Sequence, residues 1–326
     1  MKKLTVVMLA ASILAAGLAS SCEKKIKIGI LQPVEHEALD VARKGFMEGL
    51  AEKGYDTSKV KFVYRNGGGK EADISSYAKS LVSRCDMSLG IGTGASVSLK
   101  SAATDKGLTK PLLFTAVTDP VDAKLVSSLD NGEGFVTGSS DMQPIADQIL
   151  LIKECIPSVD KVGILYTSSE SNSEAQAKVA EAALTLSGIT TVRKTCTGPS
   201  DVSSTSLALA SEEGIDAIYI PTDNNIAANT DAVKTAVAGK NVLVVAGEES
   251  MMKGCGHVTL SVDYKALGKV TGHMAAEILS KGIKAGELPV KTMTKEECNY
   301  VMSAANCASS GVTLPDEVIA KCTNVD

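Results

Sequence analysis

The sequence predicts an α/β protein made of two similar lobes, and two observations support this fold class. Short apolar runs alternate with segments of helical periodicity, and parallel strands joined by helices form sheets that are covered on both faces. Short motifs also recur about 130 residues further along the chain, a spacing close to the length of one typical domain. We therefore expect one parallel sheet in each half of the chain.

The chain begins with a segment typical of an export signal. Lys2 and Lys3 precede an apolar run over 4–18, which is followed by small residues. The alternative is an uncleaved membrane anchor. However, the run is shorter than the roughly 20 residues that a spanning helix needs, and charged residues follow at 23–25. We predict that the segment is removed.

Cys22 is the residue that a lipid would modify. We predict cleavage of a signal peptide over 1–21 and a lipidated tether over 22–25, which anchors an extracytoplasmic chain to a membrane, in the periplasm or at the cell surface. Ala19 stands where lipoproteins usually have Leu, so secretion without a lipid is the alternative. The remaining 305 residues exceed the size at which one core usually keeps growing, which also favours two lobes.

The strand and helix pattern begins at residue 26. An apolar run over 26–31 predicts a strand, and Leu39, Ala42, Phe46 and Leu50 then recur on one face of a helix. Six further apolar runs predict strands, with Ala- and Lys-rich helical stretches between them: 60–64, 87–91, 112–114, 162–166, 217–220 and 242–246.

The two halves of the chain repeat one another. The matched segments are 29–32 with 163–166, 91–93 with 220–222, and 114–116 with 244–246. Polar clusters follow the predicted strand ends in both halves: 35–36, 94–96, 118–119, 170–173, 223–224 and 248–250. Open parallel sheets bind ligands just outside the carboxyl ends of their strands, so both sets should face a shared cleft.

Opposite charges are expected on the two sides of this cleft. The segment 90–96 ends a strand and opens a helix, where free backbone N–H groups attract an anion such as a carboxylate; a purely structural turn is the alternative. Asp223 and Glu248 follow strands of the second half and are candidates to hold an ammonium group, which together would suit an amino acid. The alternative is that these acids cap helices.

Several other classes of site are disfavoured. The segment 66–70 lacks the first glycine and the final hydroxyl of a phosphate loop, and no GxSxG motif is present. Glu35, His36 and Glu37 diverge too much for a metal cluster. Removal of the signal takes the net charge from −5 to −7, which disfavours nucleic acid. We expect a binding protein rather than an enzyme, with no cofactor and no metal.

Seven cysteines remain after Cys22. We interpret them as mostly structural, since no CxxC or His-Cys metal spacing occurs. The cluster of Cys298, Cys307 and Cys322 is the most favourable place for a disulfide. Tyr166, Tyr219 and Tyr264 lie near strand ends, where a ring could stack on a flat ligand, although a buried Tyr is more often part of a core.

An ordered set of short motifs resembles a known family. The motifs lie at 35–40, 91–93, 114–121, 136–141, 170–173, 221–224 and 263–264. Together they resemble the substrate-binding lipoproteins of ABC transporters, in the tryptophan and aromatic amino acid-binding branch. The resemblance departs at Glu37, where the family usually has Pro, and this changes the expected shape of the first-lobe entrance.

The resemblance implies a type I periplasmic-binding fold, in which two Rossmann-like lobes with parallel sheets are joined by a three-strand hinge. The first lobe is expected over 26–141 plus 263–289, and the second over 142–262 plus 290–326. The chain would cross between the lobes near 141–143, 262–263 and 289–291.

The resemblance also implies the ligand-binding residues. The first-lobe set is Gln32, Glu35, Thr93, Gly94, Ala95, Ser96, Thr115, Val117, Thr118 and Ser140. The second-lobe set is Glu170, Asn172, Ser173, Asp223, Asn224 and Glu248. No catalytic residue is expected.

The implied function is ligand binding for import. A monomeric chain would hold a small amino acid, aromatic by resemblance, between lobes that close about the hinge. An ABC permease and its ATPase would then receive the ligand. The alternatives are a sensory module of the same fold, or a branched-chain amino acid or nucleoside as ligand.

Overall fold

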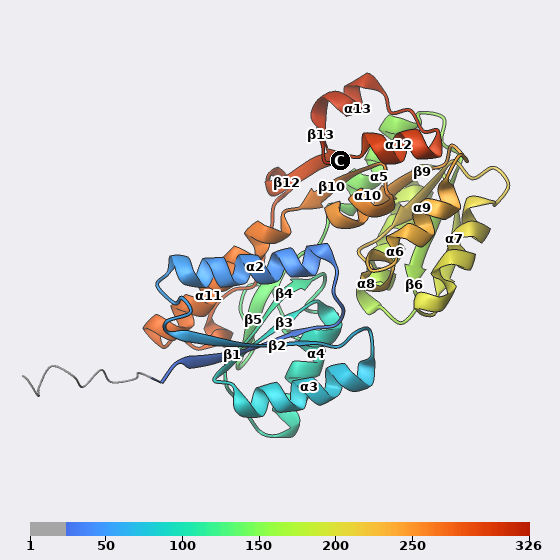
Figure 1. The fold of residues 1–326 in the computed structure, drawn as a ribbon. Coiled ribbons are helices and arrows are strands. Elements are labelled where there is room, and N and C mark those ends of the chain that lie inside the picture. The colour runs from blue at the N-terminus through green and yellow to red at the C-terminus, as the bar shows by residue number, and fades with distance from the viewer. Residues whose placement is uncertain (1–23) are drawn as a thin grey trace, which may run out of the picture.

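Two separate sheets organise the computed structural model, which describes residues 24–326 (Figure 1). The first sheet has the strand order β11-β5-β4-β3-β1-β2, and all its pairings are parallel. Its strands are β1 (Ile26–Gln32), β2 (Val60–Asn66), β3 (Met87–Ile91), β4 (Leu112–Val117), β5 (Val136–Ser140) and β11 (Lys291–Thr292).

Helices cover both faces of the first sheet. On one face α2 (Glu37–Glu52) and α11 (Tyr264–Lys281) pack against Ile28, Ile30 and Leu89 of the strands. On the other face α3 (Glu71–Arg84) and α4 (Thr93–Asp105) share a core with Phe114 and Val117. Burial on both faces explains why these strands are near-continuous apolar runs.

The second sheet has the order β13-β12-β10-β9-β8-β6-β7. It is parallel except where β12 runs antiparallel to β10. Its strands are β6 (Lys161–Thr167), β7 (Thr190–Cys196), β8 (Ala217–Ile220), β9 (Leu243–Ala246), β10 (Val258–Val262), β12 (Cys298–Met302) and β13 (Thr323–Asn324).

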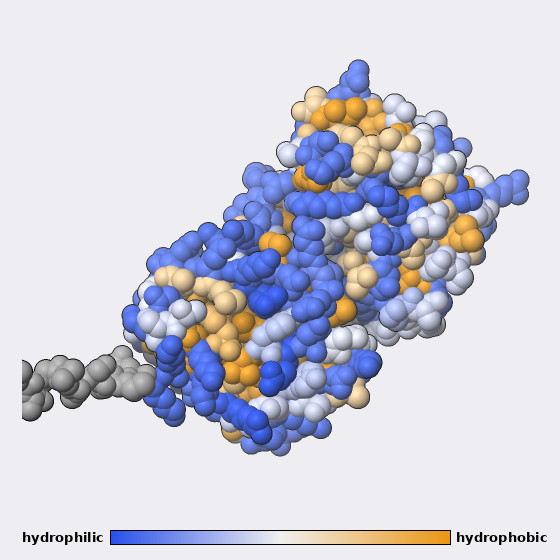
Figure 2. Space-filling model, viewed as in Figure 1, coloured by the Kyte–Doolittle hydropathy of each residue, from blue (hydrophilic) through white to orange (hydrophobic). Residues whose placement is uncertain are grey.

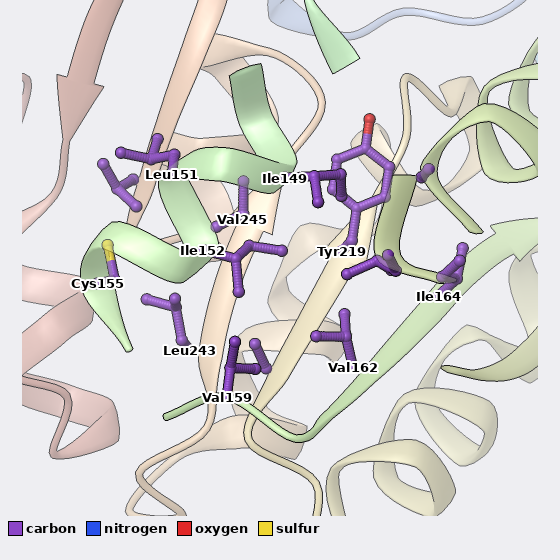
Figure 3. Packing of buried hydrophobic residues seen from close by; sticks show 14 of the residues in the cluster. Ile149, Leu151, Ile152, Cys155, Val159, Val162, Ile164, Tyr219, Leu243 and Val245 are labelled. Carbon is purple, nitrogen blue, oxygen red and sulfur yellow. The ribbon is translucent and has the colours of Figure 1, made fainter. Parts of the chain in front are cut away.

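Helices also cover both faces of the second sheet. One face carries α5 (Ile145–Cys155), α6 (Ser171–Leu186), α12 (Ala304–Ser310) and α13 (Asp316–Lys321). Figure 3 shows Ile149 and Ile152 of α5 packing against Tyr219 and Val245 of the strands. The other face carries α7 (Val202–Ala210), α8 (Asn224–Ala227), α9 (Thr230–Val237) and α10 (Glu249–Cys255).

The chain changes sheet three times, after β5, after β10 and after β11. The last change lies further along the chain than the sequence predicts. Lys291 and Thr292 still pair with Ser139 and Ser140 of the first sheet. Val290 also buries its side chain in the core beneath that sheet. Residues 290–292 therefore belong with the first lobe, because both their backbone and a buried side chain are paired there.

The cysteines of the described chain are all free thiols, so the predicted disulfide within the cluster of Cys298, Cys307 and Cys322 is absent among them. The packing separates Cys298 from the other two. Cys298 contacts the first-lobe core, whereas Cys307 and Cys322 contact the core of the second lobe. Cys22, the predicted lipidation site, lies outside the described residues.

The visible surface is mostly hydrophilic, with apolar residues exposed in small areas on both lobes (Figure 2). Across residues 24–326, no helix combines the length and the apolar character that crossing a membrane requires.

Candidate functional site

A small, partly enclosed cavity lies between the two lobes. The first lobe and the start of α11 contribute His36, Leu39, Thr93, Ala116, Thr118, Asp141 and Tyr264. The second lobe contributes Asn172, Thr222, Asp223, Asn224, Ala227 and Glu248. Most of these residues follow the carboxyl end of a parallel strand, where such sheets bind ligands.

A wider groove adjoins the cavity. The groove and the cavity share Thr93, Asn172 and Asn224, so the two spaces are adjacent. Ile74 and Val97 add apolar surface to the first-lobe side of the groove. A ligand held in the cavity could therefore extend a side chain into the groove.

The cavity is acidic. Asp141, Asp223 and Glu248 are each at most 3% exposed, and burial raises the pKa of all three carboxyl groups. No Lys or Arg occurs among the described residues that line this cavity. A positively charged group entering the cavity would thus be stabilised without competition from a protein cation.

Two of the three carboxylates are already occupied as helix caps. Asp223 caps α8 and accepts hydrogen bonds from the backbone N–H groups of Ile226 (2.9 Å) and Thr167 (2.6 Å). Glu248 caps α10 and accepts from the N–H groups of Ser250 (2.6 Å) and Met251 (2.7 Å). Both acids therefore have the capping role that the sequence left as the alternative.

Asp141 has a different set of partners. It accepts hydrogen bonds from two hydroxyl groups, Tyr264 at 2.6 Å and Thr118 at 3.2 Å, and it caps no helix. A carboxylate can accept about four hydrogen bonds, so Asp141 retains capacity for a ligand donor. The sequence analysis missed Asp141 as a site residue, because the strand that precedes it is rich in Gly, Ser and Thr and is not an apolar run.

The start of α4 supplies the donors that the sequence predicted there. The N-cap residue Gly92 has φ 83°, a left-handed conformation that favours glycine. Within the described chain, the backbone N–H groups of Thr93, Gly94 and Ala95 have no hydrogen-bond acceptor. An added Cβ at Gly94 would meet no atom within 4 Å, so the backbone there is open to the groove. These features suit a carboxylate.

The lobes touch one another across the cavity. His36 Nε2 lies 3.1 Å from Asn224 Oδ1, and Gln176 of the second lobe donates to Thr118 Oγ1 of the first at 3.2 Å. At the outer edge, Lys253 forms an ion pair with Glu37 at 3.0 Å. The lobes are therefore closed in this structure.

The structure brings part of the predicted site together. Six predicted residues line the cavity: Thr93, Thr118, Asn172, Asp223, Asn224 and Glu248. Gly94 and Glu170 line the adjoining groove. The other eight line neither space: Gln32, Glu35, Ala95, Ser96, Thr115, Val117, Ser140 and Ser173.

A bulge in β4 explains part of this difference. The register of β4 against β5 shifts between Phe114 and Val117, and within this shift Ala116 lines the cavity while Thr115 and Val117 are buried away from it. Ala116 also has φ 55°, which places a small residue in a left-handed conformation at the cavity wall.

The remaining predicted residues have structural partners instead. Ser96 donates to Gly92 O, Ser140 to Thr118 O, and Ser173 to Thr222 O. Gln32 donates to Val34 O and Asp40, and Glu35 is an exposed residue that accepts from Tyr64. Ala95 packs in the core beneath the sheet.

Of the three tyrosines considered as stacking residues, Tyr264 alone lines the cavity. Tyr219 is fully buried and donates to Gln148 at 2.8 Å, and the hydroxyl of Tyr166 accepts from Arg193 at 2.6 Å. Among residues 24–326, no group of three or more His, Cys, Asp or Glu side chains is placed to hold a metal ion.

Comparison with known proteins places this geometry in context. Residues 27–326 match the family described as ABC transporter substrate binding protein. The chain is 33% identical over 277 residues to a tyrosine-binding protein of Clostridioides difficile strain R20291, covering 84% of this chain and 78% of that protein.

Two solved structures, one with a bound ligand and one without, are similar to this structure to different degrees. An ABC domain from Streptococcus pneumoniae in complex with L-Trp has a TM-score of 0.86 at 32% identity, covering 93% of this chain and all of that one. A ligand-free, open substrate-binding protein with adhesive properties from Clostridium difficile has a TM-score of 0.68 at 28% identity, covering 92% and 99%. At nearly equal identity, the present structure is more similar to the ligand complex, in agreement with the contacts between its lobes.

Proposed function

Because this chain belongs to the ABC transporter substrate-binding protein family, we propose that its ligand is a free amino acid held in the cavity between the lobes. The observation that carries this proposal is Asp141, a buried carboxylate with unused acceptor capacity in a cavity that also contains the open start of α4. The zwitterion of an amino acid has an ammonium group for Asp141 and a carboxylate for the start of α4.

Asp141 would bind the ammonium group of the ligand. An ammonium has three donors, and a charge-assisted hydrogen bond to a buried carboxylate is about twice as strong as a neutral one. Asp223 and Glu248 add negative potential while they remain caps. The carboxylate of the ligand would accept hydrogen bonds from the N–H groups at the start of α4, near Thr93 and Gly94.

The proposed ligand class is aromatic. Two relatives support this choice by what their names state, one as a tyrosine-binding protein and one as a complex with L-Trp. The groove beside the cavity offers the room that a large side chain needs, with apolar surface from Ile74 and Val97. A nucleoside has no ammonium group for Asp141, so it fits this cavity less well than an amino acid does.

Binding would act through closure of the lobes. A ligand that contacts Asp141 in the first lobe and Asn172 or Asn224 in the second favours the closed state over the open one. A permease would read the closed form, and no bond of the ligand is made or broken. A lipid on Cys22 would keep the extracytoplasmic chain, as a monomer, close to that permease.

Isothermal titration calorimetry tests the proposal. We expect the wild-type chain to bind L-Tyr, L-Trp or L-Phe, and Asp141→Asn to lower the affinity at least about tenfold through loss of a charged acceptor. The Asn side chain can still pair with the hydroxyls of Thr118 and Tyr264, so the fold is preserved. Asp231→Asn, an exposed change on α9, is the matched control.

Two results would contradict the proposal. If Asp141→Asn binds as tightly as the wild type, Asp141 is not the ammonium site. If the wild-type chain binds leucine or a nucleoside but none of the aromatic amino acids, the proposed ligand class is wrong.

A further inference from the structure

His36 connects the two lobes through its ring. It is the N-cap residue of α2, but its side chain makes no capping hydrogen bond. Instead the ring lines the cavity, and its Nε2 atom lies 3.1 Å from Oδ1 of Asn224 on the second lobe. Whether His36 or Asn224 donates in this contact depends on the tautomer of the ring and on the orientation of the amide.

Glu170 fixes the orientation of the Asn224 amide. Oε2 of Glu170 accepts hydrogen bonds from the backbone N–H of Asn224 at 2.9 Å and from its Nδ2 atom at 2.7 Å, while Oε1 accepts from the N–H of Asn225 at 2.8 Å. The NH₂ of Asn224 therefore faces Glu170, and its oxygen faces His36.

An oxygen opposite Nε2 means that Nε2 carries the hydrogen. The other ring nitrogen, Nδ1, is then an acceptor with a free lone pair in the neutral ring. Nδ1 is buried, and it has no hydrogen-bond partner among the described residues. A buried acceptor without a partner is unfavourable, so a donor from a bound ligand would relieve that cost.

We infer that Nδ1 of His36 accepts a hydrogen bond from the ammonium group of the bound amino acid, with Glu170 and Asn224 holding the ring in the tautomer that permits it. This inference rests on the proposed function. The carboxylate of the ligand has no donor to offer, and the ammonium is the donor that the acidic cavity attracts. Asp40 and Asp223 lie near the ring and favour a positive charge beside it.

The consequence is that ligand recognition and lobe closure share one residue. When the lobes are closed, Oδ1 of Asn224 accepts from Nε2 and holds the ring in this tautomer and orientation. His36 would therefore favour the ammonium group in the closed state, where the ligand must be retained, and less so in the open state.

A substitution that keeps the contact between the lobes separates the two roles. In His36→Gln the side-chain amide can still donate to Asn224, but no acceptor remains at the position of Nδ1. We expect at least about a tenfold loss of affinity for L-Phe, whose side chain has no donor, and a similar loss for L-Tyr and L-Trp. For 3-phenylpropanoate, which lacks the ammonium, wild type and variant should bind equally. His273→Gln, a change of a partly exposed residue on α11, is the control and should leave all affinities unchanged.

A second measurement reads the tautomer directly. Nitrogen-15 NMR of histidine-labelled protein saturated with L-Phe should show hydrogen on Nε2 and none on Nδ1 of His36, with the signal assigned by its loss in His36→Gln.

The outcomes are distinct. A complex with hydrogen on Nδ1, or a His36→Gln variant that loses affinity equally for L-Phe and 3-phenylpropanoate, would overturn the inference while the proposed function stands. A loss seen with L-Tyr and L-Trp but not with L-Phe would assign His36 to the side chain of the ligand instead. If the wild-type chain binds none of the three amino acids, the proposed function fails, and the ammonium assignment fails with it.

Discussion

The hydrogen-bond partners of the buried carboxylates separate their roles. Asp223 and Glu248 each accept backbone N–H groups at the start of a helix, so substitution of either would disturb the fold as well as any ligand. Asp141 accepts only rotatable hydroxyls, which can adjust to a new charge in the cavity. Asp141 is therefore the carboxylate whose charge can be tested without loss of structure.

Protonation of Asp141 gives a prediction for pH. Burial raises the pKa of this carboxyl group in the ligand-free fold, and a bound ammonium lowers it again. Ligand binding should therefore release protons between the ordinary value of about 4 and the raised pKa, and affinity should rise with pH across that window. Calorimetry in buffers of different ionisation enthalpy measures the protons released, and Asp141→Asn should release fewer.

The raised pKa of Asp141 has the opposite effect on the stability of the ligand-free fold, which falls as pH rises. Because the folded-state pKa of Asp141 is raised, its contribution to the stability of the ligand-free fold is fully present below about pH 4 and is lost as pH rises through the raised value.

The control for proton release on ligand binding is Asp56→Asn, which changes an exposed carboxylate far from the cavity and should release the same number of protons as the wild type. Equal proton release by Asp141→Asn would contradict the prediction.

Single residues of the site were only partly predictable from the sequence. Asp223 and Glu248 were predicted because each lies shortly after an apolar strand, and Thr93 because the resemblance implies it. Asp141 was not predicted, since the strand before it is not an apolar run. His36 was expected near the cleft, but its partner Asn224, 188 residues away in the chain, was not foreseen. The bulge that turns Ala116 to the cavity has no signal in the sequence, because β4 is an apolar run that is buried on both faces.

The elements themselves were more predictable than the residues. All seven apolar runs that predicted strands form β1, β2, β3, β4, β6, β8 and β9. Two of the strands that were not predicted have identifiable causes. β5 is made of small and hydroxyl residues, and β7 lies at a sheet edge with Arg193 and Lys194 in its sequence.

The packing of α2 against α11 is the element-scale feature that positions the cavity wall. Both helices begin at the cavity, α2 after His36 and α11 at Tyr264. Their backbones approach closely because each has two glycines at a spacing of four, Gly45 and Gly49 on α2, Gly268 and Gly272 on α11. A Cβ built on any of these glycines would lie within 2.3 Å of a carbonyl oxygen of the other helix.

Gly268→Ala should therefore separate the two helices. The new methyl group would lie 2.1 Å from the carbonyl oxygen of Ala42, and overpacking of this kind costs about 1–3 kcal/mol of the free energy of unfolding. Urea denaturation measures the loss. The matched control is Gly94→Ala in α4, where the methyl meets no atom within 4 Å and the free energy of unfolding should not fall. A Gly268→Ala variant as stable as the wild type would contradict the packing.

At the scale of the whole molecule, three chain crossings connect the lobes. In the closed arrangement, side-chain contacts across the cleft also hold them together. Thr118 and Gln176 form the inner contact, and His36 with Asn224 forms the contact beside the ligand cavity. Glu37, Lys253 and Glu249 form the outer one, with Lys253 paired to both acids. The outer contact depends on Glu37, the position at which the sequence resemblance leads us to expect Pro.

The ion pair of Glu37 and Lys253 should stabilise the closed state. Both side chains are partly exposed, so the pair contributes about 0.2–1 kcal/mol, which corresponds to a loss of up to about fivefold in ligand affinity for Glu37→Gln. Glu37→Pro should have the same effect, because the first position of a helix tolerates Pro and His36 before it is already extended. The loss should shrink at high salt, where exposed pairs are screened.

Small-angle scattering provides the second measurement, since a weaker outer contact should raise the radius of gyration of the ligand-free variant toward that of an open form. The control is Glu277→Gln, which removes an ion pair of the same type with Lys281 inside α11 and should change neither affinity nor radius. If Glu277→Gln lowers affinity as much as Glu37→Gln, the effect is one of net charge. Closure would then depend on the buried contacts of Thr118 and His36, and the outer pair would be incidental.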